Sequence, residues 1–193
     1  MSAYGPSVSG MATTTPTAPA PVGERADLVD SLRRHRGFLL TTVDAITDDQ
    51  ARERTTVSEL TLGGLIKHVA TTEEQWAEFV ASGPADAIDY STVDWSNPPA
   101  EVVAFMESHR MGEDETLAGL LERYAEVAAA TDRLVAELPD LDLSWPLPEA
   151  PWFEPGARWT ARRTFLHIIA ETAQHAGHAD IIREALDGQK TMG

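Results

Sequence analysis

The sequence contains no cysteine. This absence excludes disulfide bonds, thiolate metal ligands and a cysteine nucleophile. Any metal ion that the chain binds must therefore be held by histidine, aspartate or glutamate side chains.

Basic residues are also scarce. Lys and Arg together number 15 against 31 Asp and Glu, which gives a formal net charge of −16. An acidic surface of this kind repels the phosphate backbone of nucleic acids. We therefore expect no nucleic-acid partner.

Long apolar runs are missing as well, since none approaches the length of about 18 residues that indicates a membrane span. Residues 1–24 are rich in Ser, Thr, Pro and Ala and lack the apolar core of a signal peptide. We predict that 1–24 form a disordered N-terminal tail, with Met11 as an alternative start to Met1. We also expect the protein to be cytoplasmic and to have no membrane partner.

No segment shows the alternation of a β-strand, and there is no internal repeat. Apolar residues instead recur at helical spacing in four segments, 25–47, 62–80, 115–138 and 160–187. Thr61 is a suitable N-cap for the second helix, and Gly188 is a suitable C-cap for the fourth. A long crossover, 81–114, with a short helix at 100–107, joins the second helix to the third. The pattern predicts an all-α fold, a four-helix bundle over residues 25–190.

The fourth helix carries a polar stripe within the sequence ETAQHAGHAD. On a helical wheel His167, Glu171, His175 and His178 fall within an arc of about 80°. Glu171 and His175 are four residues apart, the spacing by which one helix offers two ligands to one ion. His68, on the apolar stripe of the second helix, offers a third. Two imidazoles and one carboxylate with an open fourth position form the pattern of a catalytic zinc site.

The spacing alone leaves a second interpretation equally open. A histidine on an apolar helix face is commonly a core residue with a hydrogen bond. Glu171 and His175 would then form a buried polar pair that links helices. Such a pair is costly without a cation, because charges removed from water need partners.

Two segments resemble the DinB-like superfamily: TLGGLIKHVATTEEQW and RWTARRTFLHIIAETAQHAGHADIIREALDG. The closer likeness is to an actinobacterial subgroup that includes mycothiol-dependent maleylpyruvate isomerase and mycothiol S-transferases. It extends over residues 25–188 and is weak across the crossover. The resemblance implies a four-helix bundle that holds a divalent metal through His68, Glu171 and His175, and that often forms a homodimer.

Four further residues, His178, His167, His35 and Arg162, are candidates for the surroundings of the site. His178 is either a ligand or an outer donor that orients the carboxylate, and we expect the second role. His167 and His35 each either line the site or serve as buried packing residues. Arg162, at a position where the subgroup often has arginine, would bind a substrate carboxylate or face solvent. His109 is expected to be exposed.

The Pro-rich segment before the fourth helix carries four aromatic residues, Trp145, Trp152, Phe153 and Trp159. They either form a lid over the metal or cap the end of the bundle, which is the commoner role of such residues.

These observations favour a metal-dependent S-transferase in which the ion activates a small-molecule thiol of the mycothiol type for attack on an electrophile. Zinc is the expected metal, and the ligand set is also compatible with Ni²⁺ or Mn²⁺. One alternative is a zinc-dependent hydrolase that uses metal-bound water, with His178 as general base. The other is a non-catalytic, dimeric metal- or ligand-binding bundle in which His178 completes a closed site.

Overall fold

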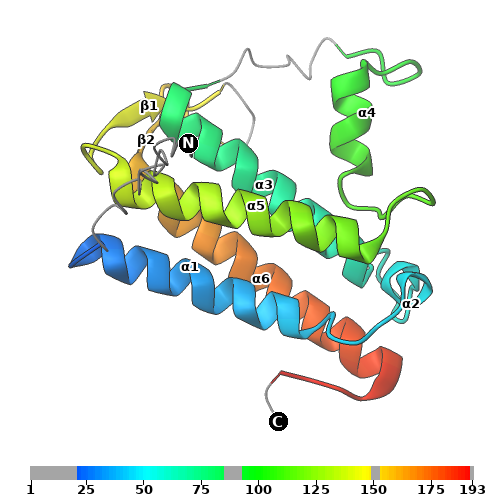
Figure 1. The fold of residues 1–193 in the computed structure, drawn as a ribbon. Coiled ribbons are helices and arrows are strands. Elements are labelled where there is room, and N and C mark those ends of the chain that lie inside the picture. The colour runs from blue at the N-terminus through cyan, green and yellow to red at the C-terminus, as the bar shows by residue number, and fades with distance from the viewer. Residues whose placement is uncertain (1–20, 85–92, 149–152, 192–193) are drawn as a thin grey trace, which may run out of the picture.

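The computed structural model describes residues 21–84, 93–148 and 153–191. Four long helices, α1 (Glu24–Thr41), α3 (Leu62–Ser82), α5 (Leu117–Glu137) and α6 (Ala161–Asp187), form a bundle (Figure 1). Helix α1 packs against α5 and α6, and α3 packs against the same two helices, so the four surround one core. The predicted all-α fold and its long crossover between the second and third long helices are confirmed. Nearly all of the predicted tail lies outside the described residues.

Four short elements complete the fold. They are α2 (Asp48–Arg52), α4 (Ala100–Glu107), β1 (Ser144–Pro146) and β2 (Arg158–Thr160). Figure 1 shows α4 set apart from the four long helices. The prediction that the chain has no strand is wrong, because β1 and β2 pair antiparallel with Trp145 opposite Trp159. Strands of three residues are too short to show a two-residue period in the sequence.

The helix ends follow local capping rules, with one difference from the prediction. Thr61 accepts a hydrogen bond from the backbone N–H of Gly64, and Gly188 has the left-handed conformation of a C-cap, so both predicted caps are confirmed. Helix α1, however, ends at Thr41 and not at 47. The buried Arg183 of α6 donates hydrogen bonds to the carbonyl groups that follow, those of Thr42 and Asp44, at 2.9 and 2.8 Å. These contacts hold the chain in a turn before α2 begins.

The apolar core is divided into two clusters along the bundle axis. The first includes Leu39, Leu65, Val69, Leu120 and Ala179. The second includes Leu32, Val80, Val135, Phe165 and Ile168. On each long helix, the buried residues of the two clusters are separated by about two to three helical turns. Polar side chains occupy this intermediate level.

This polar layer contains a buried ion-pair network. The guanidinium of Arg36 (α1) donates to both carboxylate oxygens of Glu73 (α3), at 2.5 and 3.1 Å, and to Asp132 (α5) at 2.8 Å. Arg36 and Glu73 are only 4% and 1% exposed. Tyr124 and Thr172 are buried at the same level. Burial, and then the negative charge of Glu73, raise the pKa of the Tyr124 hydroxyl well above its ordinary value.

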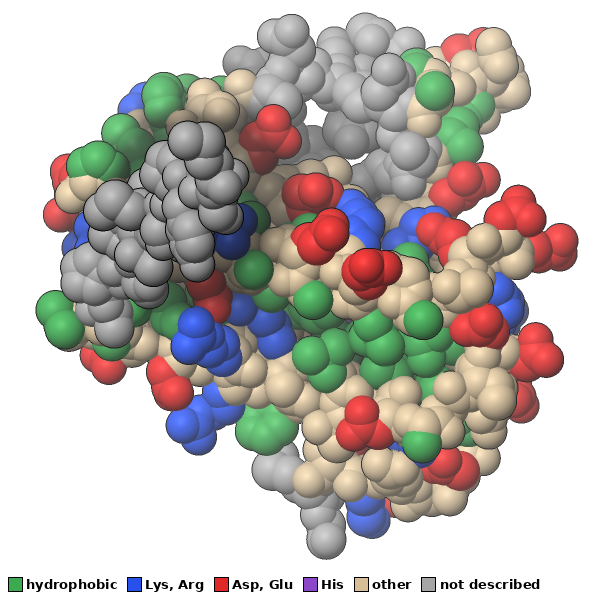
Figure 2. Space-filling model, viewed as in Figure 1, with side chains coloured by type: hydrophobic (Ala, Val, Ile, Leu, Met, Phe, Trp, Pro, Cys, Tyr) green, Lys and Arg blue, Asp and Glu red, His purple; other side chains and the backbone are tan. Residues whose placement is uncertain are grey.

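The surface reflects the composition. Figure 2 shows Asp and Glu side chains spread over the face viewed in Figure 1, with hydrophobic side chains gathered near its middle. Within the described residues, no helix combines the length and apolar character needed to cross a membrane.

We predict that Glu73→Ala lowers the free energy of unfolding by about 3–5 kcal/mol, because it leaves the buried guanidinium of Arg36 without its main partner. The control is Asp30→Ala, which removes the exposed pair between Asp30 and Arg34. This control should change stability by less than about 0.5 kcal/mol. Chemical denaturation measures both, and equal effects would contradict the assigned importance of the buried pair.

Candidate metal centre

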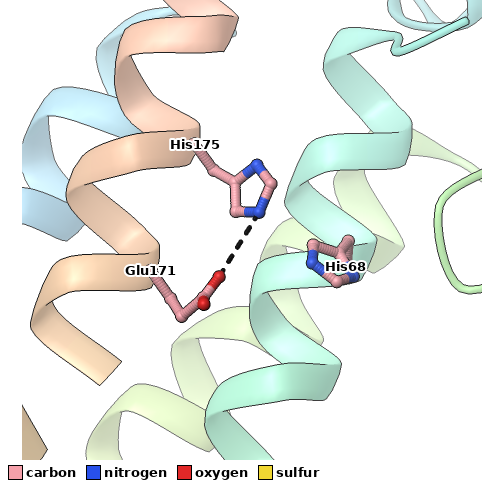
Figure 3. Close-up of side chains that lie close together, drawn as sticks. All are labelled: His68, Glu171 and His175. Carbon is pink, nitrogen blue, oxygen red and sulfur yellow. Dashed lines mark ion pairs between the residues drawn. The ribbon is translucent and has the colours of Figure 1, made fainter. Parts of the chain in front are cut away.

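The three predicted ligands come together where α3 packs against α6. His68 lies on α3, while Glu171 and His175 lie one turn apart on α6 and project toward it (Figure 3). Each residue offers one nitrogen or oxygen donor atom, and these atoms all lie within 4.8 Å of one another. Among the residues that the structure describes, no other group of three or more His, Asp or Glu converges in this way.

Glu171 is flanked by two imidazoles on its own helix. Its Oε2 lies 3.5 Å from Nε2 of His175, the contact drawn in Figure 3, and its Oε1 lies 3.7 Å from Nε2 of His167. The carboxylate is about a third exposed. No lysine or arginine pairs with it among the described residues, in contrast to the buried Glu73, which is neutralised by Arg36.

Both histidines of the cluster are held in the neutral form. Burial, followed by the imidazoles of His109 and His175, lowers the pKa of His68 to about 4. Burial also lowers the pKa of His175, although the carboxylate of Glu171 opposes this effect. A neutral imidazole keeps a nitrogen lone pair for a metal, so two such rings and a carboxylate fit a divalent cation.

His178 contacts the candidate ligand His175, whereas we expected it to contact Glu171. Its Nδ1 lies 3.4 Å from Nδ1 of His175, on the opposite side of that ring from the nitrogen nearest Glu171. Its contact is therefore with the ring of His175 and not with the carboxylate of Glu171. A group that holds the second nitrogen of a metal-binding histidine fixes the orientation of its ring.

His167 has a packing role and a contact with the site at once. Its ring meets those of Trp76 and Trp159 edge-on, with centroids 5.0 and 4.9 Å away, and those two indoles stack on each other. Burial lowers the pKa of His167. The aromatic contacts hold this imidazole beside Glu171.

The expectation that His109 is exposed is wrong. It is half-buried, and its ring stacks on that of His68 with centroids 3.9 Å apart and planes 22° apart. It follows α4 in the crossover, so its distance from His68 in the sequence gave no hint of the contact. Gly63 and Gly64 were the one sequence feature that pointed to a segment packed closely on α3, because glycine in a helix often marks a close approach of another backbone.

Two other candidates lie away from the three convergent donors. His35 is half-buried against Phe38, and the neighbouring Arg36 takes the inward position on α1. Arg162, in the first turn of α6, forms ion pairs with Glu24 and Asp142. Its guanidinium links α1 to the loop before β1, so these two carboxylates already neutralise its charge.

The aromatic residues before α6 divide between the two expected roles. The indole of Trp145 donates to the carbonyl of Val80 and covers the end of α3, which is a capping role. Trp159 stacks on Trp76 and contacts His167. These three residues form an aromatic wall beside Glu171. Phe153 packs edge-on against Trp159. Trp152 lies outside the described residues.

A crevice too narrow to hold a water molecule lies between α3 and α6, between the candidate site and the polar layer. Glu171 and His175 line it together with Val69, Thr72, Glu73, Ile168 and Thr172. The site is thus built at the level where the apolar core is interrupted.

The bundle and its convergent histidine and glutamate donors define a protein of the DinB-like class. A family model for mycothiol-S-transferases matches residues 27–188. The chain therefore belongs to the mycothiol-S-transferase family, and the predicted resemblance is confirmed.

One solved structure adds information on the fold. The crystal structure of a conserved protein from Enterococcus faecalis is similar with a TM-score of 0.63 and 16% sequence identity. The match covers 87% of this chain and 99% of that one. At this identity the likeness shows a shared fold alone. No curated protein sequence matches the chain significantly.

We predict that His178→Ala weakens zinc binding about 10- to 100-fold, because His175 loses the group that orients its ring. His35→Ala, a histidine outside the cluster, should leave the affinity unchanged. Competition with a chromophoric chelator measures both constants. An unchanged affinity in His178→Ala would show that the contact between the two rings does not serve metal binding.

Proposed function

We propose that the protein is a metal-dependent S-transferase. Its divalent ion, for which we propose zinc, is held by His68, Glu171 and His175. The main support for this proposal is the environment of the Glu171 carboxylate. It is a half-buried carboxylate that faces two imidazoles of lowered pKa and has no basic partner among the described residues. A carboxylate that no basic side chain neutralises, next to imidazoles with free lone pairs, offers the charge and the donor atoms that a divalent cation needs.

The ligand set supports a catalytic rather than a closed site. Three protein donors leave one position of a tetrahedral ion for a small molecule. A bound zinc ion would lower the pKa of a thiol in that position and so favour the thiolate. His178 stays on the Nδ1 side of His175, which supports a role in orienting that ring rather than in filling the position.

Membership of the mycothiol-S-transferase family supports a low-molecular-weight thiol as the substrate, with mycothiol as the specific proposal. In the transfer the thiol gives its proton to solvent, and a sulfur electron pair forms the new bond to an electrophilic carbon. In a substitution, that carbon releases its leaving group with the electrons of the broken bond. In an addition, the electrons of the π bond move to the atom at its other end, which takes up a proton. The protein side chains hold the ion and orient its ligands.

The aromatic wall suggests where the electrophile lies. Trp76, Trp159 and His167 form a partly exposed surface next to Glu171, and the guanidinium of Arg163 lies over the Trp159 ring at 4.4 Å. A wall of this composition favours apolar or aromatic electrophiles. Arg162 is not part of this surface, because its guanidinium is paired with Glu24 and Asp142.

We expect mycothiol added to the Co²⁺-substituted protein to produce the ultraviolet absorption of a sulfur–cobalt bond, and we expect conjugation of a model electrophile to require the thiol. Glu171→Gln should lose both signals. Hydrolysis of a substrate without any thiol would instead support the metal-dependent hydrolase. Cobalt binding with neither thiol binding nor turnover would support a non-catalytic bundle. Light scattering in the same samples tests the proposed homodimer.

A further inference from the structure

Each of the three proposed ligands is paired with a second histidine. His167 contacts the carboxylate of Glu171, and His178 contacts the ring of His175. For His68 the corresponding residue is His109, whose ring stacks on it at 3.9 Å. The first two supporting residues lie on α6 itself, within one turn of their partners. His109 comes from the crossover, so its position depends on how that segment packs on α3.

Two glycines in the first turn of α3 permit this packing. A Cβ atom at Gly64 would overlap the backbone carbonyl of His109, and one at Gly63 would overlap the side chain of Met111. The obstacle at Gly64 is backbone, which cannot move aside as a flexible side chain can. Gly64 also lies one helical turn before His68. The close approach at Gly64 therefore places the ring of His109 against the ring of His68.

Other contacts hold the crossover in this position. The ammonium of Lys67 donates to the carbonyl of Arg110 at 3.1 Å and to the carboxylate of Glu115 at 2.9 Å. Ser108 and Met111, on either side of His109, are both buried. The hydroxyl of Ser108 lies 3.3 Å from Nδ1 of His109. The segment around His109 is thus anchored at several points, and the stacked ring is fixed rather than a loose surface side chain.

We propose that His109 is a positioning residue for the metal centre: its stacked ring, placed by the close approach at Gly64, holds the His68 imidazole in the orientation for metal binding. This inference rests on the proposed function, since it assumes that His68 is a ligand. The stacking surface carries the effect, so an aromatic ring without a metal-binding nitrogen should replace His109.

The test compares zinc affinities of the full chain and four variants by competition with a chromophoric chelator. His109→Ala and Gly64→Ala should each weaken binding about 10- to 100-fold, the usual range for residues that support a ligand. His109→Phe, which keeps a flat ring, should stay within about threefold of wild type, a small part of that range. Gly177→Ala is the matched control, because a Cβ at this helical glycine between His175 and His178 meets no atom within 4 Å. It should bind zinc as wild type does.

The metal-free variants are also compared by thermal unfolding, so that a loss of fold is recognised separately from a loss of affinity. Normal zinc binding by His109→Ala would overturn this inference and leave the proposed function intact. So would a His109→Phe protein as weak as His109→Ala, because the imidazole itself and not the stacked ring would then be required. A wild-type protein that binds no zinc would overturn the proposed function.

Discussion

The buried ion pair between Arg36 and Glu73 is the constraint around which the bundle is organised. Two charged groups removed from water need complete pairing, and here the guanidinium satisfies Glu73 with two hydrogen bonds and reaches Asp132 with a third nitrogen. The network links α1, α3 and α5 at one level. It divides the apolar core into two clusters and keeps a polar environment in the middle of the helices.

The candidate metal centre uses the same level of the bundle on the side of α6. Glu171 is the carboxylate there that has no basic partner among the described residues, and it lines the same narrow crevice as Glu73. The bundle thus holds two carboxylates in different states, one neutralised by an internal arginine and one surrounded by neutral imidazoles. The second state has the composition of a site for a cation. The contrast is the structural basis for proposing a cation beside Glu171 and an internal ion pair at Glu73.

The sequence predicted well the features that depend on local spacing. The four long helices, the caps at Thr61 and Gly188 and the shared face of Glu171 and His175 all follow from residues within one or two turns of each other. Features that depend on tertiary approach were not predictable. Nothing in the spacing on α1 indicated that Arg36, rather than its neighbour His35, would be buried, because its partner Glu73 lies on another helix.

The contact of His109 with His68 is a second example of this limit. It arises from the packing of the crossover on the glycines of α3, and a segment of weak helical pattern gives no orientation in advance. The pairing of β1 with β2 was missed for a related reason, since it joins two three-residue segments across a Pro-rich loop. The residues offered as ligands could be named from spacing and resemblance. Their metal remains a prediction.

The most direct test is the metal content of the untagged protein after incubation with zinc and gel filtration, measured by elemental mass spectrometry. The account predicts about one zinc per chain in wild type, as expected for one three-ligand site. The same content is expected in Glu78→Gln, which alters an exposed carboxylate of α3. Zinc should be lost in His68→Ala, Glu171→Gln and His175→Ala. A wild-type chain that retains no zinc, or variants that retain it fully, would contradict the metal centre and leave Glu171 and its histidines as a polar contact between helices.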